Sequence, residues 1–219
     1  MNTQTEMLES ALPRSSKPRK HRLWSWLPIR NLAERHRARV LDHLLALDEE
    51  DRHLRFGHVA SDDQIHQYVA HLDFTRDELF GVFDARLRLV AMAHLAFAED
   101  RRSAEFGVSV HSRVRGRGFG GRLFHHAVMH GRNRGARSMA IHLARENAAM
   151  LSIVRRSGAA LSFEGADVVA QMPLPAETLR SQVGALVESQ AADIDYRIKM
   201  QVLRLDRLWP GLRHHVPPT

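Results

Sequence analysis

The feature that most restricts the fold of this chain is a glycine-rich run, Arg115-Gly116-Arg117-Gly118-Phe119-Gly120-Gly121. Apolar alternation over residues 104–110 predicts a strand before the run, and residues 123–134 have the spacing of an amphipathic helix after it. Four glycines in six residues let a ligand approach the backbone and leave the amide N–H groups uncovered by Cβ atoms. The start of the helix adds free N–H groups and a partial positive charge. The run therefore predicts a loop that binds phosphate, in particular a pyrophosphate.

Composition excludes several kinds of chemistry. The sequence contains no cysteine, which excludes disulfides, zinc–thiolate centres and thiol nucleophiles. The 15 histidines include no His-Glu-x-x-His spacing, so no metal site is expected. No apolar run has the length of a signal peptide or of a transmembrane helix. We therefore expect a soluble cytoplasmic protein that makes no membrane contact.

Positive charge is concentrated near the start of the chain. Residues 14–22 contain five basic side chains and no acid: Arg14, Lys17, Arg19, Lys20 and Arg22. Taking these five from the net charge of +7 leaves +2 for all other residues. The remainder is only mildly basic, so the overall charge does not predict a nucleic-acid-binding domain.

The pattern divides the chain into three parts. Residues 1–22 contain two prolines and no hydrophobic period, which predicts a disordered basic tail. Residues 23–175 have the patterning of one folded domain. In residues 176–219, apolar residues from Val187 to Leu208 advance in steps of three and four, which predicts a long amphipathic helix. That helix could pack on its own domain or form a homodimer.

Within the domain, the patterns predict the element order β-α-α-β-β-β-α-β-α-β-β. A short edge strand is expected within residues 23–32, because an edge tolerates Pro28. The first helix begins at Ala33, residues 48–57 form a charged connection, and Ser61 caps the second helix. The later predictions are a hairpin over 79–83 and 87–97, strands at 104–110 and 139–143, helices at 123–134 and up to about 156, and two short strands within 161–174.

The glycine run formally satisfies G-x-G-x-x-G, but its position argues against a dinucleotide-binding fold. Such a fold places the motif after its first strand, whereas here four candidate strands precede it. A Walker loop needs Gly-Lys-Ser/Thr, which is absent. A kinase loop needs a partnered lysine, and Lys199 is the only lysine after Lys20.

Arg115-x-x-Gly118-x-Gly120 resembles the (Gln/Arg)-x-x-Gly-x-(Gly/Ala) motif of the GCN5-related N-acetyltransferases (GNAT). The resemblance covers about residues 29–174, including the strand at 108–110, Asn147 and Gly158. It implies an α+β fold in α/β/α layers, with a mixed, mostly antiparallel sheet of six to seven strands flanked by helices. The C-terminal helix would be an extension of that fold.

A narrower resemblance is to the acetyltransferase domain of bacterial Pat-type protein lysine acetylases. It lies in residues 47–56, 61–62, 104–106 and 146–150. It implies that a protein lysine is the acceptor and that Glu105 is the general base. Glu105 also occupies a polar position in the alternating pattern of an otherwise apolar strand, as the role of general base requires.

The family resemblance implies acetyl-CoA as co-substrate and direct attack by an amine in a ternary complex. The residues it assigns to acetyl-CoA are Val108, Ser109, Val110, Arg115, Gly116, Arg117, Gly118, Phe119, Gly120, Gly121 and Asn147. Phe119 is expected to pack into the core, and Asn147 to contact the pantetheine arm or to cap a helix. Many members have a tyrosine as general acid seven residues after this Asn, where the chain has Val154.

Three functions stay open on the sequence alone. The first is acetyl transfer to a protein lysine, and the second is acetyl transfer to a small amine or amino acid. The third is a catalytically weak module that binds acyl-CoA and reports metabolic state, which Val154 keeps open. The glycine run identifies the acetyl donor and carries no information on the acceptor.

Overall fold

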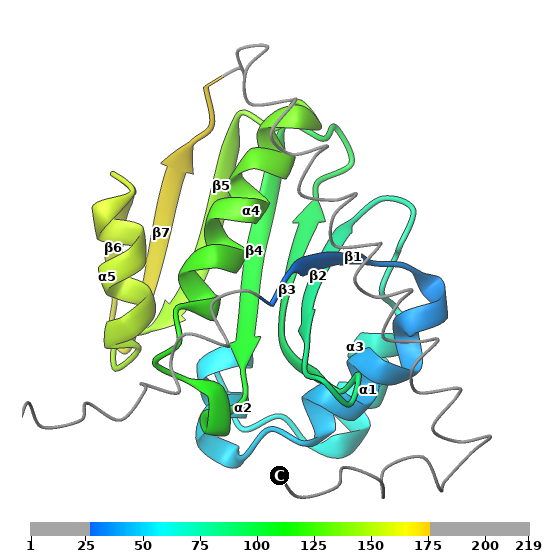
Figure 1. Ribbon diagram of the computed structural model, residues 1–219. Coiled ribbons are helices and arrows are strands. Elements are labelled where there is room, and N and C mark those ends of the chain that lie inside the picture. Colours follow the sequence, from blue (N-terminus) through cyan, green and yellow to red (C-terminus); the bar gives the residue numbers. More distant parts are fainter. Residues whose placement is uncertain (1–26, 176–219) are drawn as a thin grey trace, which may run out of the picture.

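The structure is a computed structural model that describes residues 27–175 (Figure 1). One seven-stranded sheet runs through the domain in the order β1-β2-β3-β4-β5-β7-β6. All neighbouring strands are antiparallel except β4 and β5, which are parallel. The mixed, mostly antiparallel sheet is thereby confirmed. The strands are β1 (Ile29–Leu32), β2 (Glu78–Phe83), β3 (Leu89–Phe97), β4 (Ser103–Val110), β5 (Ser138–Ala144), β6 (Ala160–Glu164) and β7 (Asp167–Pro173).

Helices cover both faces of this sheet, as the α/β/α expectation requires. Helix α4 packs across β2, β3 and β4, while α1 packs on α3 and β3 (Figure 1). Helix α2 contacts β4 and β5. The helices are α1 (Arg37–Leu45), α2 (Glu49–Phe56), α3 (Asp62–Ala70), α4 (Phe119–Asn133) and α5 (Ala148–Arg156), with 3-10 turns η2 (Glu34–His36) and η3 (Ser112–Val114).

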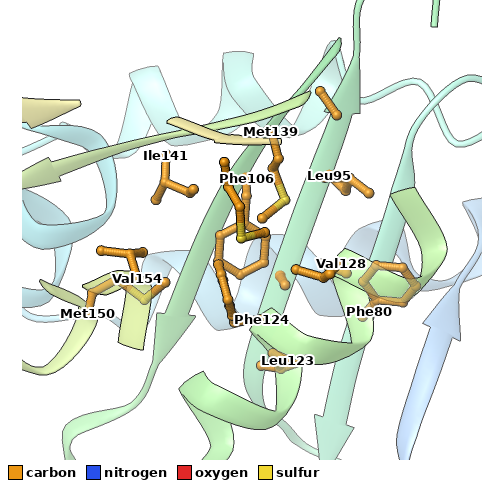
Figure 2. Close-up of a cluster of buried hydrophobic side chains, with 14 of the residues drawn as sticks. Phe80, Leu95, Phe106, Leu123, Phe124, Val128, Met139, Ile141, Met150 and Val154 are labelled. Atoms are coloured by element: carbon orange, nitrogen blue, oxygen red, sulfur yellow. The ribbon is translucent and has the colours of Figure 1, made fainter. Parts of the chain in front are cut away.

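Two hydrophobic cores follow from this layering. The larger lies between the sheet and the α4 and α5 layer, where the Phe106 and Phe124 rings meet edge to face at 5.5 Å (Figure 2). The smaller joins α1 and α3 to the other face of β2 and β3. Phe119 is 1% exposed and belongs to the larger core, as the sequence predicts. Burial of the apolar side chains of these cores is the main favourable contribution to the stability of the domain.

Local chemistry starts and stops several elements where the sequence predicts. Ser61 accepts a hydrogen bond from the Gln64 N–H, and the Gln64 side chain accepts from the Ser61 N–H, forming a capping box for α3. In the β2–β3 hairpin, the Asp84 carboxylate accepts the N–H groups of Arg86 and Arg88. The edge strand expected within residues 23–32 is β1, which among residues 27–175 pairs with β2 alone.

The expected charged connection at residues 48–57 is wrong, because residues 49–56 form helix α2. Asp48 caps its start by accepting the Asp51 N–H, and Gly57 ends it with a left-handed φ of 78°. The helix has no broad apolar stripe, so periodicity does not reveal it. Instead, Arg52 fastens it to the domain by donating hydrogen bonds to main-chain carbonyls, which are those of Leu45, Leu47 and Ala60.

The helix predicted to begin at Leu123 begins four residues earlier, at Phe119. Phe119, Gly120 and Gly121 therefore form its first turn and are not loop residues. Glycine is a poor helix former, which explains why the sequence alone places the start too late. Burial of Phe119 outweighs that low propensity.

Predictions for residues 1–22 and 176–219, including the basic tail, the amphipathic helix and a homodimer through it, lie outside the described residues. Among residues 27–175, none of the helices has the length and apolar character needed to cross a membrane.

Candidate active site

The two parallel strands at the centre of the sheet separate along their length. Pairing between β4 and β5 runs from Ser103 with Ser138 to Glu105 with Ala140 and then ends. Beyond that point the strands diverge toward their C-terminal ends (Figure 1). Main-chain groups of residues 106–110 on this side of β4 are released from the sheet ladder. The opening provides an edge against which a ligand can form main-chain hydrogen bonds.

A cleft of about 420 Å³ lies beside this opening. We call it the loop cleft, because the glycine run, the second half of β4 and one side of α5 line it. All the residues that the sequence assigns to acetyl-CoA line this cleft except Arg117. The Arg117 guanidinium instead donates to the Arg113 carbonyl at 3.4 Å.

The backbone of the glycine run is shaped to receive an anion. Gly116 and Gly118 have φ values of 71° and 80°, in the region that side chains other than glycine avoid. Gly118 is the N-cap of α4 and offers no side chain to the N–H groups of the first turn. A Cβ atom on Gly120 or Gly121 would meet only Ile153 Cδ1, at 3.9 Å, so its absence leaves room in the cleft. These N–H groups and the helix dipole fit a pyrophosphate.

Arg115 has a partner other than phosphate in this structure. Its guanidinium contacts the carboxylate of Asp51 and lies 3.9 Å from Glu50. Asp51 is 5% exposed and stands in the first turn of α2, so the ion pair ties the glycine run to that helix. A contact between Arg115 and phosphate stays a prediction.

A second cavity, of about 650 Å³, adjoins the loop cleft. We call it the Glu105 pocket. Its walls come from α2 and the turn after it, from β4 and β5, and from the β6–β7 hairpin. Leu54, Val108, Asn147 and Met150 line both cavities, so the two are joined at that point.

Charges in the Glu105 pocket are mixed, with an acidic majority. Its carboxylates are Glu105 on β4 and Glu164 and Asp167 at the paired ends of β6 and β7. Arg55 supplies a permanent positive charge, and His58 and His142 also line the pocket. His142 is exposed on β5. The pocket suits an organic cation.

Residues 30–158 match the family model described as Acetyltransferase (GNAT) family. The chain belongs to the GNAT family. No curated protein matches the sequence.

Solved structures share the GNAT fold at low sequence identity. The GNAT domain of S. lividans PAT is 21% identical, with a TM-score of 0.56 over 67% of this chain and 89% of that one. A ribosomal-protein-alanine N-acetyltransferase from Brucella melitensis is 18% identical, with a TM-score of 0.53 over 68% and 100%. A spermidine N-acetyltransferase from Vibrio cholerae is 20% identical, with a TM-score of 0.51 over 68% and 95%. At these identities the likeness concerns the fold alone.

As a GNAT acetyltransferase, the protein uses acetyl-CoA as co-substrate. The loop cleft fits that molecule, because it combines unobstructed helix N–H groups with the open edge of β4. Asn147 stands where the cleft meets the Glu105 pocket, and its Oδ1 accepts the Met150 N–H at 3.1 Å. It therefore caps α5, one of the two roles considered for it.

Val154, at the position of the family tyrosine, is fully buried in the larger core (Figure 2). It therefore has no access to the cleft, besides lacking a proton to donate. The site contains no acid at this position of α5.

Four residues that the sequence does not single out form a chain of hydrogen bonds beside the Glu105 pocket. Arg55 Nη2 donates to the Tyr68 hydroxyl at 2.7 Å, which lies 2.7 Å from His94 Nδ1. His94 Nε2 is 3.0 Å from Asp77 Oδ2. These residues come from α2, α3, β3 and the turn before β2, so no sequence spacing could reveal the chain.

Burial and neighbouring groups shift the pKa values of two residues in this chain of hydrogen bonds. Burial raises the pKa of Tyr68, and the carboxylates of Asp77 and Glu105 add to that effect against the charge of Arg55. Burial alone would raise the pKa of Asp77. Hydrogen bonds from His94 and Arg76 outweigh it and leave that pKa below the usual range.

Proposed function

We propose that this protein transfers the acetyl group of acetyl-CoA directly to a primary amine held in the Glu105 pocket, with Glu105 as general base. The carrying observation is the junction of the two cavities at Leu54, Val108, Asn147 and Met150. It allows a thioester in the loop cleft to face an amine in the pocket without an intermediate carrier. Direct attack needs no nucleophilic side chain, which agrees with the absence of cysteine.

The chemistry requires the amine to lose a proton before or during attack. A lysine-type ammonium has a pKa of about 10.4, so it enters the site charged. The carboxylates of the Glu105 pocket attract that cation, and in this proposal Glu105, which lines the pocket, takes its proton directly or through water. The free amine then forms a C–N bond with the carbonyl carbon, and the C–S bond breaks.

The departing thiolate needs no dedicated acid. A thiol has an ordinary pKa of about 8.5, so its thiolate is a competent leaving group near neutral pH. In this proposal solvent protonates the thiolate, because buried Val154 cannot. The pH dependence would then report the base alone.

For the acceptor we propose a lysine side chain of a protein. The support is the resemblance of residues 47–56, 104–106 and 146–150 to Pat-type lysine acetylases, together with the acidic character of the pocket. The second candidate is a small amine. The facing carboxylates of Glu164 and Asp167 favour it, since they could hold a second positive charge on a small molecule.

Two measurements test the proposal. Calorimetric titration with acetyl-CoA measures binding to the loop cleft, and release of free thiol measures transfer to small amines and to lysine-containing proteins. Binding with transfer to an amine is the expected result. Binding without transfer to any amine would identify an acyl-CoA-binding sensor and overturn the enzymatic mechanism.

A further inference from the structure

Arg55 lines the Glu105 pocket, and some of its N–H donors have no acceptor in the described part of the chain. Nη2 donates to Tyr68, whereas the buried Nε has no acceptor within residues 27–175. A guanidinium remains charged and carries five N–H donors, and a buried donor without a partner is costly. Nε itself is closed to solvent, but Nη1 is not buried and has no hydrogen-bond partner within residues 27–175, so an acceptor oxygen of a ligand in the pocket can bind Nη1.

Packing fixes this guanidinium against β4. Its carbon lies 5.0 Å from the centre of the Phe56 ring and 5.3 Å from that of Tyr68. The guanidinium also lies against Gly107, where a Cβ atom would come within 2.6–2.8 Å of the guanidinium atoms. The absence of a side chain at Gly107 is therefore what allows Arg55 to lie on the strand.

Arg55 is thereby placed beside the proposed base. Glu105 and Gly107 are two residues apart on β4, so they face the same side of the sheet about 7 Å apart. The guanidinium covers Gly107, and Glu105 and Arg55 line the same pocket. A molecule whose amine reaches Glu105 from this side passes the donors of Arg55.

The chain of hydrogen bonds that begins at Arg55 fixes the orientation of the Arg55 guanidinium. Because a guanidinium only donates, the Tyr68 oxygen accepts from it, and the Tyr68 hydrogen is directed to His94 Nδ1. His94 Nε2 then carries the hydrogen that Asp77 accepts. Asp77 is anchored in turn by the Phe97 N–H of β3, at 3.2 Å. This buried chain has no part in the proposed transfer, and its free end is Arg55.

We infer that Arg55 is a specificity-determining residue that binds a carbonyl or carboxylate oxygen of the acceptor, about the length of a lysine side chain from the reacting nitrogen. The inference rests on the proposed function. It names the acceptor class as lysine with its main-chain oxygen, free or within a peptide. The four methylenes of lysine span a distance similar to that between Gly107 and Glu105 on β4.

The test compares acceptors that differ in that oxygen. Pentylamine has none, free lysine has a carboxylate, and Nα-acetyl-lysine methylamide has peptide carbonyls. For the wild-type protein, kcat/KM is expected to be at least about 10-fold higher for one of the lysine compounds than for pentylamine. A preference for free lysine would assign a carboxylate, and a preference for the amide would assign a peptide.

Two variants connect that preference to Arg55. Arg55→Gln removes the donors, and Gly107→Ala keeps them but displaces the guanidinium with its new Cβ atom. In both variants, the ratio of kcat/KM for the preferred lysine compound to kcat/KM for pentylamine is expected to fall to within about threefold of unity. The main reason is that the KM of the lysine compound rises. Arg137→Gln removes the same charge from an exposed position before β5 and should keep the ratio.

The failures are distinguishable. A wild-type protein that acetylates pentylamine as well as the lysine compounds overturns the inference and leaves the proposed function intact. A preference that survives in Gly107→Ala and in Arg55→Gln overturns it too, and Gly107→Ala alone decides if Arg55→Gln does not fold. Absence of transfer to all three amines overturns the inference, whereas the proposed function is overturned only if lysine-containing proteins and other small amines are not acetylated either.

Discussion

Arg115, in the glycine run, forms an ion pair with buried Asp51 of α2, a helix that borders both cavities. The residue that the family motif assigns to phosphate thus also holds a wall of the candidate active site in place. Loss of either partner should loosen α2, and loss of Asp51 alone leaves the arginine available for an anion.

The first prediction separates these two roles of Arg115. Arg115→Gln should lower stability and acetyl-CoA affinity together, whereas Asp51→Asn should lower stability and leave affinity equal or higher. Because the Arg115 side chain is 38% exposed, we expect a double-mutant cycle to give a coupling energy of about 1 kcal/mol between Arg115 and Asp51. Thermal unfolding and calorimetric titration measure the two effects. Equal affinity in wild type and Arg115→Gln would remove phosphate binding from the roles of Arg115.

The second prediction concerns Gly120 and Gly118, which should respond differently to alanine. Gly120 lies in the first turn of α4, where alanine should stabilise the helix by about 0.5–1 kcal/mol. Its Cβ would nevertheless enter the loop cleft, so we expect acetyl-CoA to bind at least about 10-fold more weakly.

At Gly118 the positive φ would strain alanine by about 1–2 kcal/mol, so that variant should lose stability as well as affinity. Denaturant unfolding and acetyl-CoA titration of both variants test the pair. Unimpaired binding by Gly120→Ala would show that the pyrophosphate does not lie on this turn.

The third prediction concerns Glu105. Glu105→Gln keeps the shape of the side chain and removes its basicity, so kcat should fall about 100-fold or more. The acetyl-CoA dissociation constant should change little, because Glu105 lines only the second pocket. Glu99→Gln, in the exposed turn between β3 and β4, is the matched control for lost charge and should keep wild-type turnover. Wild-type turnover in Glu105→Gln would exclude Glu105 as the base.

The fourth prediction concerns the pH dependence of folding and His43. His43 Nδ1 lies 3.1 Å from the Leu89 carbonyl and Nε2 lies 2.8 Å from Ser109 Oγ, which suits a neutral ring. Burial, with a smaller effect of neighbouring His111, lowers the pKa of His43 to about 3. In the unfolded chain it returns to about 6.5.

The unfolded state therefore binds the proton first as the pH falls. The contribution of His43 to stability is present above about pH 6.5 and is lost between there and pH 3, at up to about 1.4 kcal/mol per pH unit. Chemical denaturation at a series of pH values gives the free energy of unfolding at each pH. Plotted against pH, this free energy should have a shallower slope for His43→Gln than for wild type. The exposed His125→Gln should retain the wild-type slope. An unchanged slope in His43→Gln would refute the prediction.

Much of the fold is already present in local sequence patterns. The capping box at Ser61, the hairpin at Asp84 and the Asn147 cap all use neighbours a few residues away, so a linear reading finds them. The glycine run is equally local in its backbone angles, but the start of α4 at Phe119 is not, because it depends on burial of that side chain.

Helix α2 shows where local patterns fail. Its caps, Asp48 and Gly57, are visible in the sequence. The helix is held in the domain by Arg52, which donates to carbonyls seven and eight residues away, and by the ion pair of Asp51 with Arg115, far along the chain. A highly polar segment offers no periodicity to detect. The helix is stable because groups elsewhere in the domain form hydrogen bonds and an ion pair with its side chains.

The sequence by itself indicated the acetyl donor, because the glycine run predicts a pyrophosphate site from local backbone chemistry and its resemblance to the GNAT motif implies that the pyrophosphate is that of acetyl-CoA. Only the tertiary structure decided what lines the Glu105 pocket, where we propose that the acceptor binds. It ended the β4–β5 pairing at Glu105 and laid Arg55 over Gly107. It also joined Tyr68, His94 and Asp77 across the chain. Those relations are distances between residues far apart in sequence, which exist only after packing brings the elements together.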